Sequence, residues 1–347
     1  MAADGTGGLA PAQATRSAVR QNRPMQQRGF GRTGWQVGDI GYGMWGMGGW
    51  TGSDDEESRA SLERAVHGGC TFFDTAWAYG MGHSERLLGE LLQAHPEHRL
   101  YTATKIPPKN ARWPARAEYP LDDVFPADHI RQFTMRSLEN LRVPTLDLIQ
   151  FHVWSDSWAD DVRWQHAIEN LKREGLVRAV GISINRWEPE NALRTLRTGL
   201  IDAVQVVYNI FDQAPEDELF PACRELNVAV IARVPFDEGT LTGMLTPHTR
   251  WPEGDFRNGY FAGNNLRDSV NRAEALRPLT PLGETMATLA LRWILSNRDV
   301  SVVIPGMRRA AHVDANLAAS DRGPLPRPLL EALRRHRWDR RPAPNSD

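Results

Sequence analysis

The amino-acid sequence predicts an α/β protein folded as a single-domain (β/α)8 barrel (TIM barrel), and three observations lead to this fold class. From Gly38 onward, short apolar runs alternate with longer amphipathic runs, there are eight apolar runs, and several of them end in a polar side chain. Alternating strands and helices over one domain-sized length indicate a parallel sheet. Eight such repeats favour a closed barrel over an open, doubly wound sheet.

The expected strands are apolar runs bounded by turn residues, and they cover residues 37–43, 70–74, 100–105, 146–152, 177–183, 201–207, 228–233 and 300–306. Helical patterns lie between them. Residues 55–69 begin with acids and end with two glycines, as the helix dipole and a C-terminal cap favour. Residues 125–143 and 280–297 place apolar residues near helical spacing. A last helix is expected after Gly306.

Two other segments stand out from this repeat. Residues 25–37 contain three glycines, and we expect a short N-terminal hairpin that plugs the amino end of the barrel. Residues 235–280 form a long loop after the seventh strand, rich in Gly, Asn, Arg and Pro. Because long loops without structure of their own are often lids or binding loops, we expect this one to serve the site.

The amino-acid composition argues against a nucleic-acid-binding or membrane-spanning protein. Of 347 residues 41% are hydrophobic, and the formal net charge of −2 gives no reason to expect a nucleic acid or an anionic membrane as partner. No apolar run approaches the roughly 20 residues that span a bilayer. The two cysteines, Cys70 and Cys223, fit reduced thiols, and we expect a cytoplasmic protein.

The chain ends differ in composition from the repeat. Residues 1–24 lack the apolar stretch of a secretory signal and are expected to form a disordered tail, although their Arg-bearing, acid-poor composition faintly resembles a transit peptide. We expect the barrel domain to cover residues 25–338 and a flexible C-terminus to cover 339–347.

Polar side chains close several of the expected strands. They are Asp74, Lys105, His152, Ser183, Gln205 and Arg233. Catalytic groups of (β/α)8 barrels lie at the carboxyl ends of the strands and on the loops that follow, so we expect these side chains to ring one mouth. Tyr79, on the loop after Asp74, is expected to return over the same mouth.

Four of these residues suit acid–base chemistry on a carbonyl group. A free tyrosine loses its proton near pH 10, and a nearby ammonium favours the phenolate. We therefore expect Lys105 to lower the pKa of Tyr79, with Asp74 holding the lysine and His152 orienting a carbonyl oxygen. Such a group can protonate a developing alkoxide.

Several stretches resemble the aldo-keto reductase family, in the same order along the chain from about residue 25 to 320. They read DTAWAYGMGHSERLLGELL, LDLIQFH, GISIN and IPGMRRAAHVDAN. The resemblance implies a (β/α)8 fold and reduction of an aldehyde or ketone by hydride transfer from C4 of a nicotinamide, or the reverse oxidation of an alcohol or aldose. It implies Tyr79 as general acid, Lys105 as modulator of its pKa, Asp74 as partner of the lysine, and His152 as orienting group. No metal is implied.

The same resemblance assigns the cofactor side. Ser183 and Asn185 would bind the nicotinamide carboxamide, Gln205 would lie beneath it, and Tyr208 would stack on the ring. The stretch PFDEGTLTG would wrap the pyrophosphate with Pro235, Phe236 and the backbone N–H groups of Gly239 and Leu241. The last helix would offer Gly306 and Arg308 to phosphate, with His312 and Asn316 near the adenine. Gly43 and Trp45 complete the expected cofactor contacts.

Arg308 as partner of the adenosine 2′-phosphate favours NADPH, with NADH possible. The sequence departs from the family pattern near this cofactor. Ile184 splits a Ser-Asn pair, Val234 replaces a serine, and Ala315 and His312 replace residues beside the adenine. Asp237 and Glu238 put two acids near an anionic ligand, so they must point away, bind ribose hydroxyls or weaken binding.

Two other functions stay open. A family member could serve as a cofactor-sensing regulatory subunit with little turnover. A metal-dependent barrel hydrolase would need several converging ligands, and His83 with Glu85 is the only hint of them. The glycine-rich GYGMWGMGG lacks the G-x-G-x-x-G spacing of a Rossmann dehydrogenase. The physiological carbonyl substrate and the oligomeric state are not readable from the sequence.

Overall fold

A computed structural model describes residues 25–50 and 52–340. The expected N-terminal tail, residues 1–24, lies outside the described residues, as do residues 341–347. Within the described ranges, no helix has the length and apolar character needed to cross a bilayer.

Eight parallel strands form one curved sheet in the order β10-β9-β8-β7-β6-β5-β4-β3. Their bounds are β3 Tyr42–Gly43, β4 Phe72–Asp74, β5 Tyr101–Ile106, β6 Leu146–Phe151, β7 Val177–Ser183, β8 Ala203–Val207, β9 Ala229–Arg233 and β10 Val302–Val303. Parallel bridges from Ile40 to Val303 and from Gly43 to Gly306 join the two edge strands. The sheet therefore closes on itself, and each expected strand overlaps one of these eight.

Glycine at position 43 permits this closure. Its N–H donates to the carbonyl of Pro305 over 3.0 Å. A Cβ built there would lie 2.7 Å from the carbonyl oxygen of Ile304, closer than real side chains approach. Gly43 thus lets the first and last strands meet.

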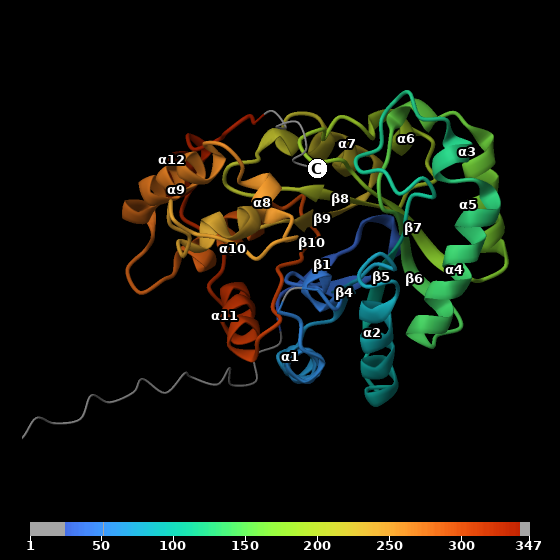
Figure 1. Cartoon of the computed structure of the whole chain (residues 1–347), viewed down its shortest axis with the longest axis horizontal. Helices are drawn as coiled ribbons and strands as arrows, with labels where there is room; N and C mark the ends of the chain where they lie inside the picture. The colour runs from blue at the N-terminus through green and yellow to red at the C-terminus, as the bar shows by residue number, and fades with distance from the viewer. Residues whose placement is uncertain (1–24, 51, 341–347) are drawn as a thin grey trace, which may run out of the picture.

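Helices surround the sheet in Figure 1. They are α1 Asp55–His67, α2 His83–Ala94, α3 Leu121–Val124, α4 Ala127–Leu141, α5 Val162–Arg173, α6 Leu193–Arg197, α7 Leu219–Leu226, α8 Arg257–Tyr260, α9 Asn265–Leu276, α10 Met286–Leu295, α11 Ala310–Asp321 and α12 Arg327–Arg334. Helix α11 packs against α1, so the last repeat covers the first.

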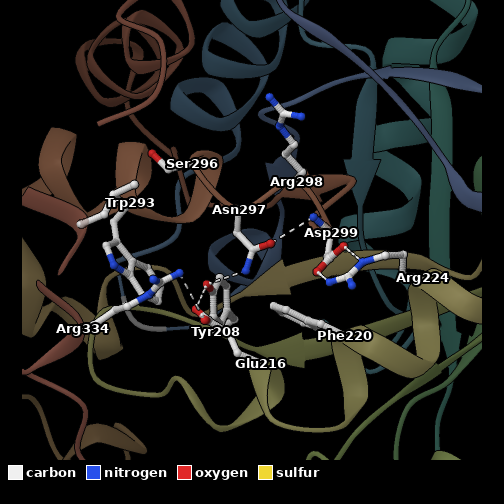
Figure 2. Close-up of a pocket in the computed structure, with 11 residues that line it drawn as sticks. Tyr208, Glu216, Phe220, Arg224, Trp293, Ser296, Asn297, Arg298, Asp299 and Arg334 are labelled. Atoms are coloured by element: carbon white, nitrogen blue, oxygen red, sulfur yellow. Dashed lines mark hydrogen bonds and ion pairs between the residues drawn. The ribbon is translucent and has the colours of Figure 1, made fainter. Parts of the chain in front are cut away.

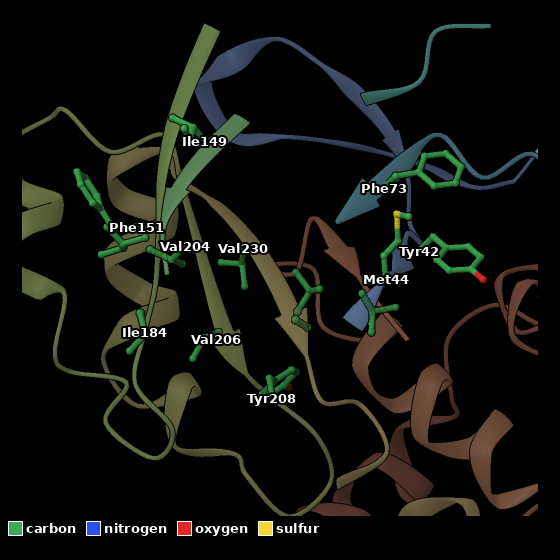
Figure 3. Close-up of a cluster of buried hydrophobic side chains, with 14 of the residues drawn as sticks. Tyr42, Met44, Phe73, Ile149, Phe151, Ile184, Val204, Val206, Tyr208 and Val230 are labelled. Atoms are coloured by element: carbon green, nitrogen blue, oxygen red, sulfur yellow. The ribbon is translucent and has the colours of Figure 1, made fainter. Parts of the chain in front are cut away.

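Side chains of most strands divide between two apolar clusters. One cluster lies inside the barrel and takes Phe72, Ala103, Leu148, Ala203 and Ile231, one from each of five strands. The other lies under the helices, and Figure 3 shows its strand members, among them Phe73, Ile149, Val204 and Val230. Each residue two positions beyond an inward side chain also points inward.

The expected N-terminal hairpin is present. Strands β1 (Gln27–Gly29) and β2 (Gln36–Gly38) pair antiparallel. Phe30, between them, is fully buried in the inner cluster, with its ring 5.3 Å from that of Phe72. The N–H of Arg32 donates to the carbonyl of Asn227, just before β9. The hairpin therefore plugs the amino end of the barrel.

The segment after β9 has more structure than the sequence suggested. Residues 235–280 were expected to be a long loop, but they contain the twelve-residue helix α9 and the short helix α8. Apolar residues at helical spacing, including Leu266, Val270 and Ala273, bury one face of α9. The Gly, Asn and Pro residues that gave the loop signal lie mainly before this helix.

Candidate active site

The four expected catalytic residues meet at the carboxyl end of the barrel. Asp74 is the last residue of β4, Lys105 lies near the end of β5, and His152 directly follows β6. All three continue the inward positions of their strands, two residues beyond Phe72 and Ala103 and four beyond Leu148. Tyr79 lies on the loop after β4.

A buried ion pair holds the ammonium of Lys105. Its Nζ donates to Oδ2 of Asp74 over 2.6 Å and to the carbonyl of Thr75 over 2.8 Å. The same Nζ lies 3.5 Å from the hydroxyl of Tyr79. Side-chain exposure is 0% for Lys105 and 3% for Asp74, so water does not screen the pair.

Two glutamines support the carboxylate from the other side. Oδ1 of Asp74 accepts from Nε2 of Gln205 over 2.7 Å and from Nε2 of Gln150 over 3.2 Å. Gln205 was expected beneath the nicotinamide, and in the structure its amide group fixes Asp74. This hydrogen bond restrains the carboxylate of the ion pair.

The electrostatics of Tyr79 differ from the sequence expectation. Burial raises the pKa of Tyr79, and the charge of Lys105 opposes that rise without cancelling it. The sequence predicted a lowered pKa because it considered the lysine and not the burial. A phenol with a raised pKa keeps its proton at neutral pH.

His152 is a neutral imidazole beside Tyr79. Burial and the positive charges of Lys105 and Arg233 hold the pKa of His152 well below its usual 6.5. Its ring meets that of Tyr79 edge to face, with centroids 5.7 Å apart. Within the described residues, its buried Nδ1 has no hydrogen-bond partner. The imidazole thus has a ring nitrogen whose hydrogen-bonding capacity is unmet.

The structure adds residues that received no role from the sequence. Arg233 ends β9 at the same mouth, where its guanidinium donates to the carbonyl of Ile184 over 3.0 Å. Trp113 meets the ring of His152 edge to face at 4.5 Å, and Trp50 meets Tyr79 at 6.1 Å. Arg233 carried the strand-end signal, but the two tryptophans lie on loops, where no periodicity marks them.

The expected nicotinamide-side residues lie at the next strand ends. Ser183 is the buried last residue of β7. Asn185 uses its Nδ2 to bind the carbonyl of Ala115 and the carboxylate of Glu188. Its buried Oδ1 has no partner among the described residues. An unpaired, buried acceptor at the mouth suits a ligand that carries an amide N–H.

The residues expected around the adenine side lie at and after the last strand. A Cβ at Gly306 would meet open space. The guanidinium of Arg308 lies against Gly52, with atoms 3.5 Å from a Cβ built there. On α11, His312 is exposed and Asn316 is buried. Trp45 is 44% exposed, and its ring lies 5.0 Å from that of Phe256, in the segment after β9.

The expected pyrophosphate loop has a compact backbone. The N–H groups of Gly239 and Leu241 both donate to the carbonyl of Phe236, over 3.0 and 2.9 Å. In this conformation they are not free for phosphate, contrary to the sequence expectation. Pro235 and Leu241 are buried, and Phe236 packs against the outer core.

Tyr208 does not lie with these residues, so its expected role as the stacking platform is corrected. It follows Val204 and Val206 on the outward side of β8, as Figure 3 shows. Its ring packs against Phe220 and Trp293, with centroids 4.8 Å away in each case. Figure 2 shows it lining a cavity of about 410 Å³ between the strands and the outer helices. Strand alternation alone predicts this outward position.

The hint of a metal site is explained by other contacts. Nε2 of His83 lies 2.8 Å from a carboxylate oxygen of Asp55. Glu85 is fully buried, and its carboxylate accepts hydrogen bonds from Thr104, Ser137 and Asn140. These bonds tie α2 to β5 and α4. Glu85 therefore serves packing between helices and does not face the mouth.

A closed barrel that brings an Asp–Lys pair, a tyrosine and a neutral histidine together at its carboxyl end defines a class of carbonyl-handling oxidoreductases. The model of the aldo/keto reductase family matches residues 39–337. The chain belongs to this family, whose members are oxidoreductases that act on carbonyl compounds with nicotinamide cofactors. The expected family and fold are thereby confirmed.

Two relatives match most of the chain. The NADH-specific methylglyoxal reductase of Escherichia coli (strain K12) is 28% identical over 330 residues, which are 90% of this chain and 100% of that protein. The NADP(+) aldo-keto reductase yakc of Schizosaccharomyces pombe is 28% identical over 298 residues, 81% of this chain and 83% of that one.

Solved structures show the same fold. The glycerol dehydrogenase of Gluconobacter oxydans has a TM-score of 0.73 at 24% identity, covering 92% of this chain and 98% of its own. An aldo-keto reductase from Klebsiella pneumoniae in complex with NADPH has a TM-score of 0.66 at 24% identity, covering 91% and 98%.

Proposed function

We propose that the protein reduces an aldehyde or ketone, or oxidises the corresponding alcohol, with Tyr79 as general acid. The observation that carries this proposal is the buried ammonium of Lys105, which lies 2.6 Å from Asp74 and 3.5 Å from the hydroxyl of Tyr79. A cation held this close stabilises the negative charge that the phenol develops as it gives up its proton. A lysine that served only as a structural ion pair would not need a phenol at that distance.

Each neighbouring residue has a task in this reaction. His152 stays neutral at physiological pH, so one ring nitrogen can donate a hydrogen bond to the carbonyl oxygen and orient it. Tyr79, which keeps its proton, delivers it to the same oxygen as negative charge builds there. Trp50 and Trp113 border the two rings and limit access of water.

The residues at the mouth fit a nicotinamide dinucleotide, which supplies the hydride when bound. The unpaired Oδ1 of Asn185 and the buried Ser183 suit the carboxamide. Open space beside Gly306 and the guanidinium of Arg308 suit a phosphate near the start of α11. We propose NADPH as the cofactor, with NADH as the alternative, since one relative is named for NADH and another for NADP(+).

The direct test is Tyr79→Phe, which removes only the hydroxyl. We expect turnover of a carbonyl panel to fall by roughly a thousandfold or more, because general acid catalysis alone supplies factors of this order. Cofactor binding, followed by quenching of tryptophan fluorescence, should stay within about twofold of the unaltered protein. Absorbance of the reduced cofactor measures turnover with both NADPH and NADH.

Tyr101→Phe is a matched control. Its ring stacks 5.1 Å from that of Trp35, against the N-terminal hairpin and far from the mouth. It should lose no activity. Turnover retained in Tyr79→Phe would refute the mechanism. Tight cofactor binding without turnover in the unaltered protein would instead indicate a cofactor-sensing regulatory subunit.

A further inference from the structure

Arg340 is a buried cation near the end of the described chain. The sequence placed it in a flexible C-terminus, yet its side chain is only 4% exposed. After α12 the chain returns toward the loop that follows β8, where the N–H of Trp338 donates to the carbonyl of Phe211 over 2.8 Å. The folded domain therefore extends at least to Arg340, and this segment has a defined position.

The guanidinium of Arg340 joins two acids from different loops. One nitrogen lies 2.5 Å from Oδ2 of Asp212, after β8, and 2.8 Å from Oδ1 of Asp237, after β9. The other terminal nitrogen donates to the hydroxyl of Tyr260 over 2.5 Å, and that hydroxyl donates to Asp237 over 2.5 Å. The ring of Trp187 lies 4.9 Å from the guanidinium carbon.

Asp237 belongs to the candidate pyrophosphate loop, whose backbone is strained. Val234, Asp237 and Glu238 all have positive φ, at 56°, 47° and 55°. This region is unfavourable for non-glycine residues and most of all for a β-branched one. Such a shape persists only where the surroundings hold it. The contacts of Asp237 with Arg340 and Tyr260 restrain the loop at this point.

These contacts also show where the carboxylates of Asp237 and Glu238 point, the two acids expected near an anionic ligand. Asp237 is fully buried and faces Arg340, and Glu238 pairs with Arg186 over 2.7 Å. Both carboxylates therefore point at cations of the protein and are not left facing an anionic ligand. Without Arg340, Asp212 and Asp237 would both lose the guanidinium that they contact directly.

We propose that Arg340 is a positioning residue for the dinucleotide. It ties the C-terminal segment to Asp237, holds residues 234–239 in their strained shape, and neutralises an acid that would otherwise repel the pyrophosphate. This inference rests on the proposed function and on the expected contact of this loop with the cofactor, made by groups other than the N–H groups of Gly239 and Leu241, which bond to Phe236. Arg340 touches neither substrate nor reacting atoms, so it should govern how long the cofactor stays bound and not the chemical step.

The test compares Arg340→Gln with Arg337→Gln. Arg337 lies in the same segment but pairs with Asp217 and Asp339 on the surface, so its loss leaves the loop untouched. We expect Arg340→Gln to raise the release rate of NADPH and its KM by roughly tenfold, with kcat lowered by no more than about twofold. Stopped-flow tryptophan fluorescence measures release.

Rescue separates a positioning role from a general loss of stability. Adding Asp237→Asn to Arg340→Gln removes the unbalanced carboxylate, and release of NADPH should return to within roughly threefold of the unaltered protein. If Arg340→Gln does not fold, Arg340→Lys keeps the charge but lacks the fork that joins two acids. It should show the same direction of change.

Hydrogen exchange of the cofactor-free protein supplies a readout independent of the reaction. Residues 235–243 should exchange faster in Arg340→Gln than in Arg337→Gln. Equal exchange and equal NADPH release in these two variants would overturn the inference. If the unaltered protein bound neither dinucleotide, the proposed function would fail, whereas the exchange comparison would still show whether Arg340 restrains the loop.

Discussion

Lys105→Met tests the ion pair on which the proposed chemistry depends. Methionine keeps a similar length and removes the ammonium, so Asp74 loses its 2.6 Å charged partner and Tyr79 loses its only cation within 3.5 Å in the described chain. The carboxylate keeps the amide groups of Gln150 and Gln205. It is left buried without a balancing charge from residue 105.

The size of the effect follows from this burial. Both side chains are at most 3% exposed, and removing one partner of a buried pair typically costs about 3–5 kcal/mol. For a chain of this size, that corresponds to a Tm lowered by roughly 4–7 °C. Loss of the charge beside the phenol should also lower kcat/KM by roughly a hundredfold to ten-thousandfold.

A second substitution separates the two effects. In Asp74→Asn with Lys105→Met no buried charge remains unbalanced, so calorimetry should show much of the lost Tm restored. Turnover should remain as low as in Lys105→Met, because the cation beside Tyr79 is still missing. If the double variant regained activity together with stability, the lysine would act through folding alone and the electrostatic reasoning would be refuted.

Two further predictions concern His152 and Tyr208. Since burial and Lys105 hold the pKa of His152 well below 6.5, the unfolded chain binds more protons between that pKa and 6.5, and stability should fall as the pH drops below about 6.5. Urea titrations near about pH 5 and about pH 7.5 should show a smaller fall for His152→Gln, and an equal fall in both proteins would contradict this assignment. Tyr208→Phe should keep cofactor affinity and kcat while losing about 1–3 kcal/mol of stability, because Glu216 and Asn297 lose a buried partner. Weaker cofactor binding in that variant would restore the stacking role that the outward position of the ring argues against.

Much of the site was predictable because polar residues at strand ends are recognisable in the sequence as the last residues of apolar runs. Asp74, Lys105 and His152 close three successive apolar runs, and parallel strands bring their carboxyl ends to one edge. Tyr79 follows from the short loop after Asp74. The predictions were wrong where the outcome depended on strand alternation or on the burial of a side chain. Alternation along β8 places Tyr208 on the outer side of the sheet, whereas the family resemblance placed it on the nicotinamide ring.

Other features had no local signal at all. Trp50 and Trp113 reach the catalytic rings from loops whose paths depend on the rest of the fold. Helix α9 follows a stretch of turn-forming residues, and its apolar face is buried only in the folded protein. Arg340 stood in a polar, proline-bearing terminus and is buried all the same. Such positions depend on contacts between residues far apart in the chain.

Side-chain alternation and helical spacing are local properties of the chain, so the repeat of eight strands and the order of the carboxyl-end residues follow from the amino-acid sequence alone. The pKa of each buried group, the side of the sheet on which Tyr208 lies, and the cation that pairs with Asp237 depend on the three-dimensional fold. Those outcomes depend on burial and on partners brought in from other segments: desolvation outweighs Lys105 at Tyr79, and a residue 103 positions away balances the loop acid. Folding alone creates the low-dielectric surroundings in which these charges act.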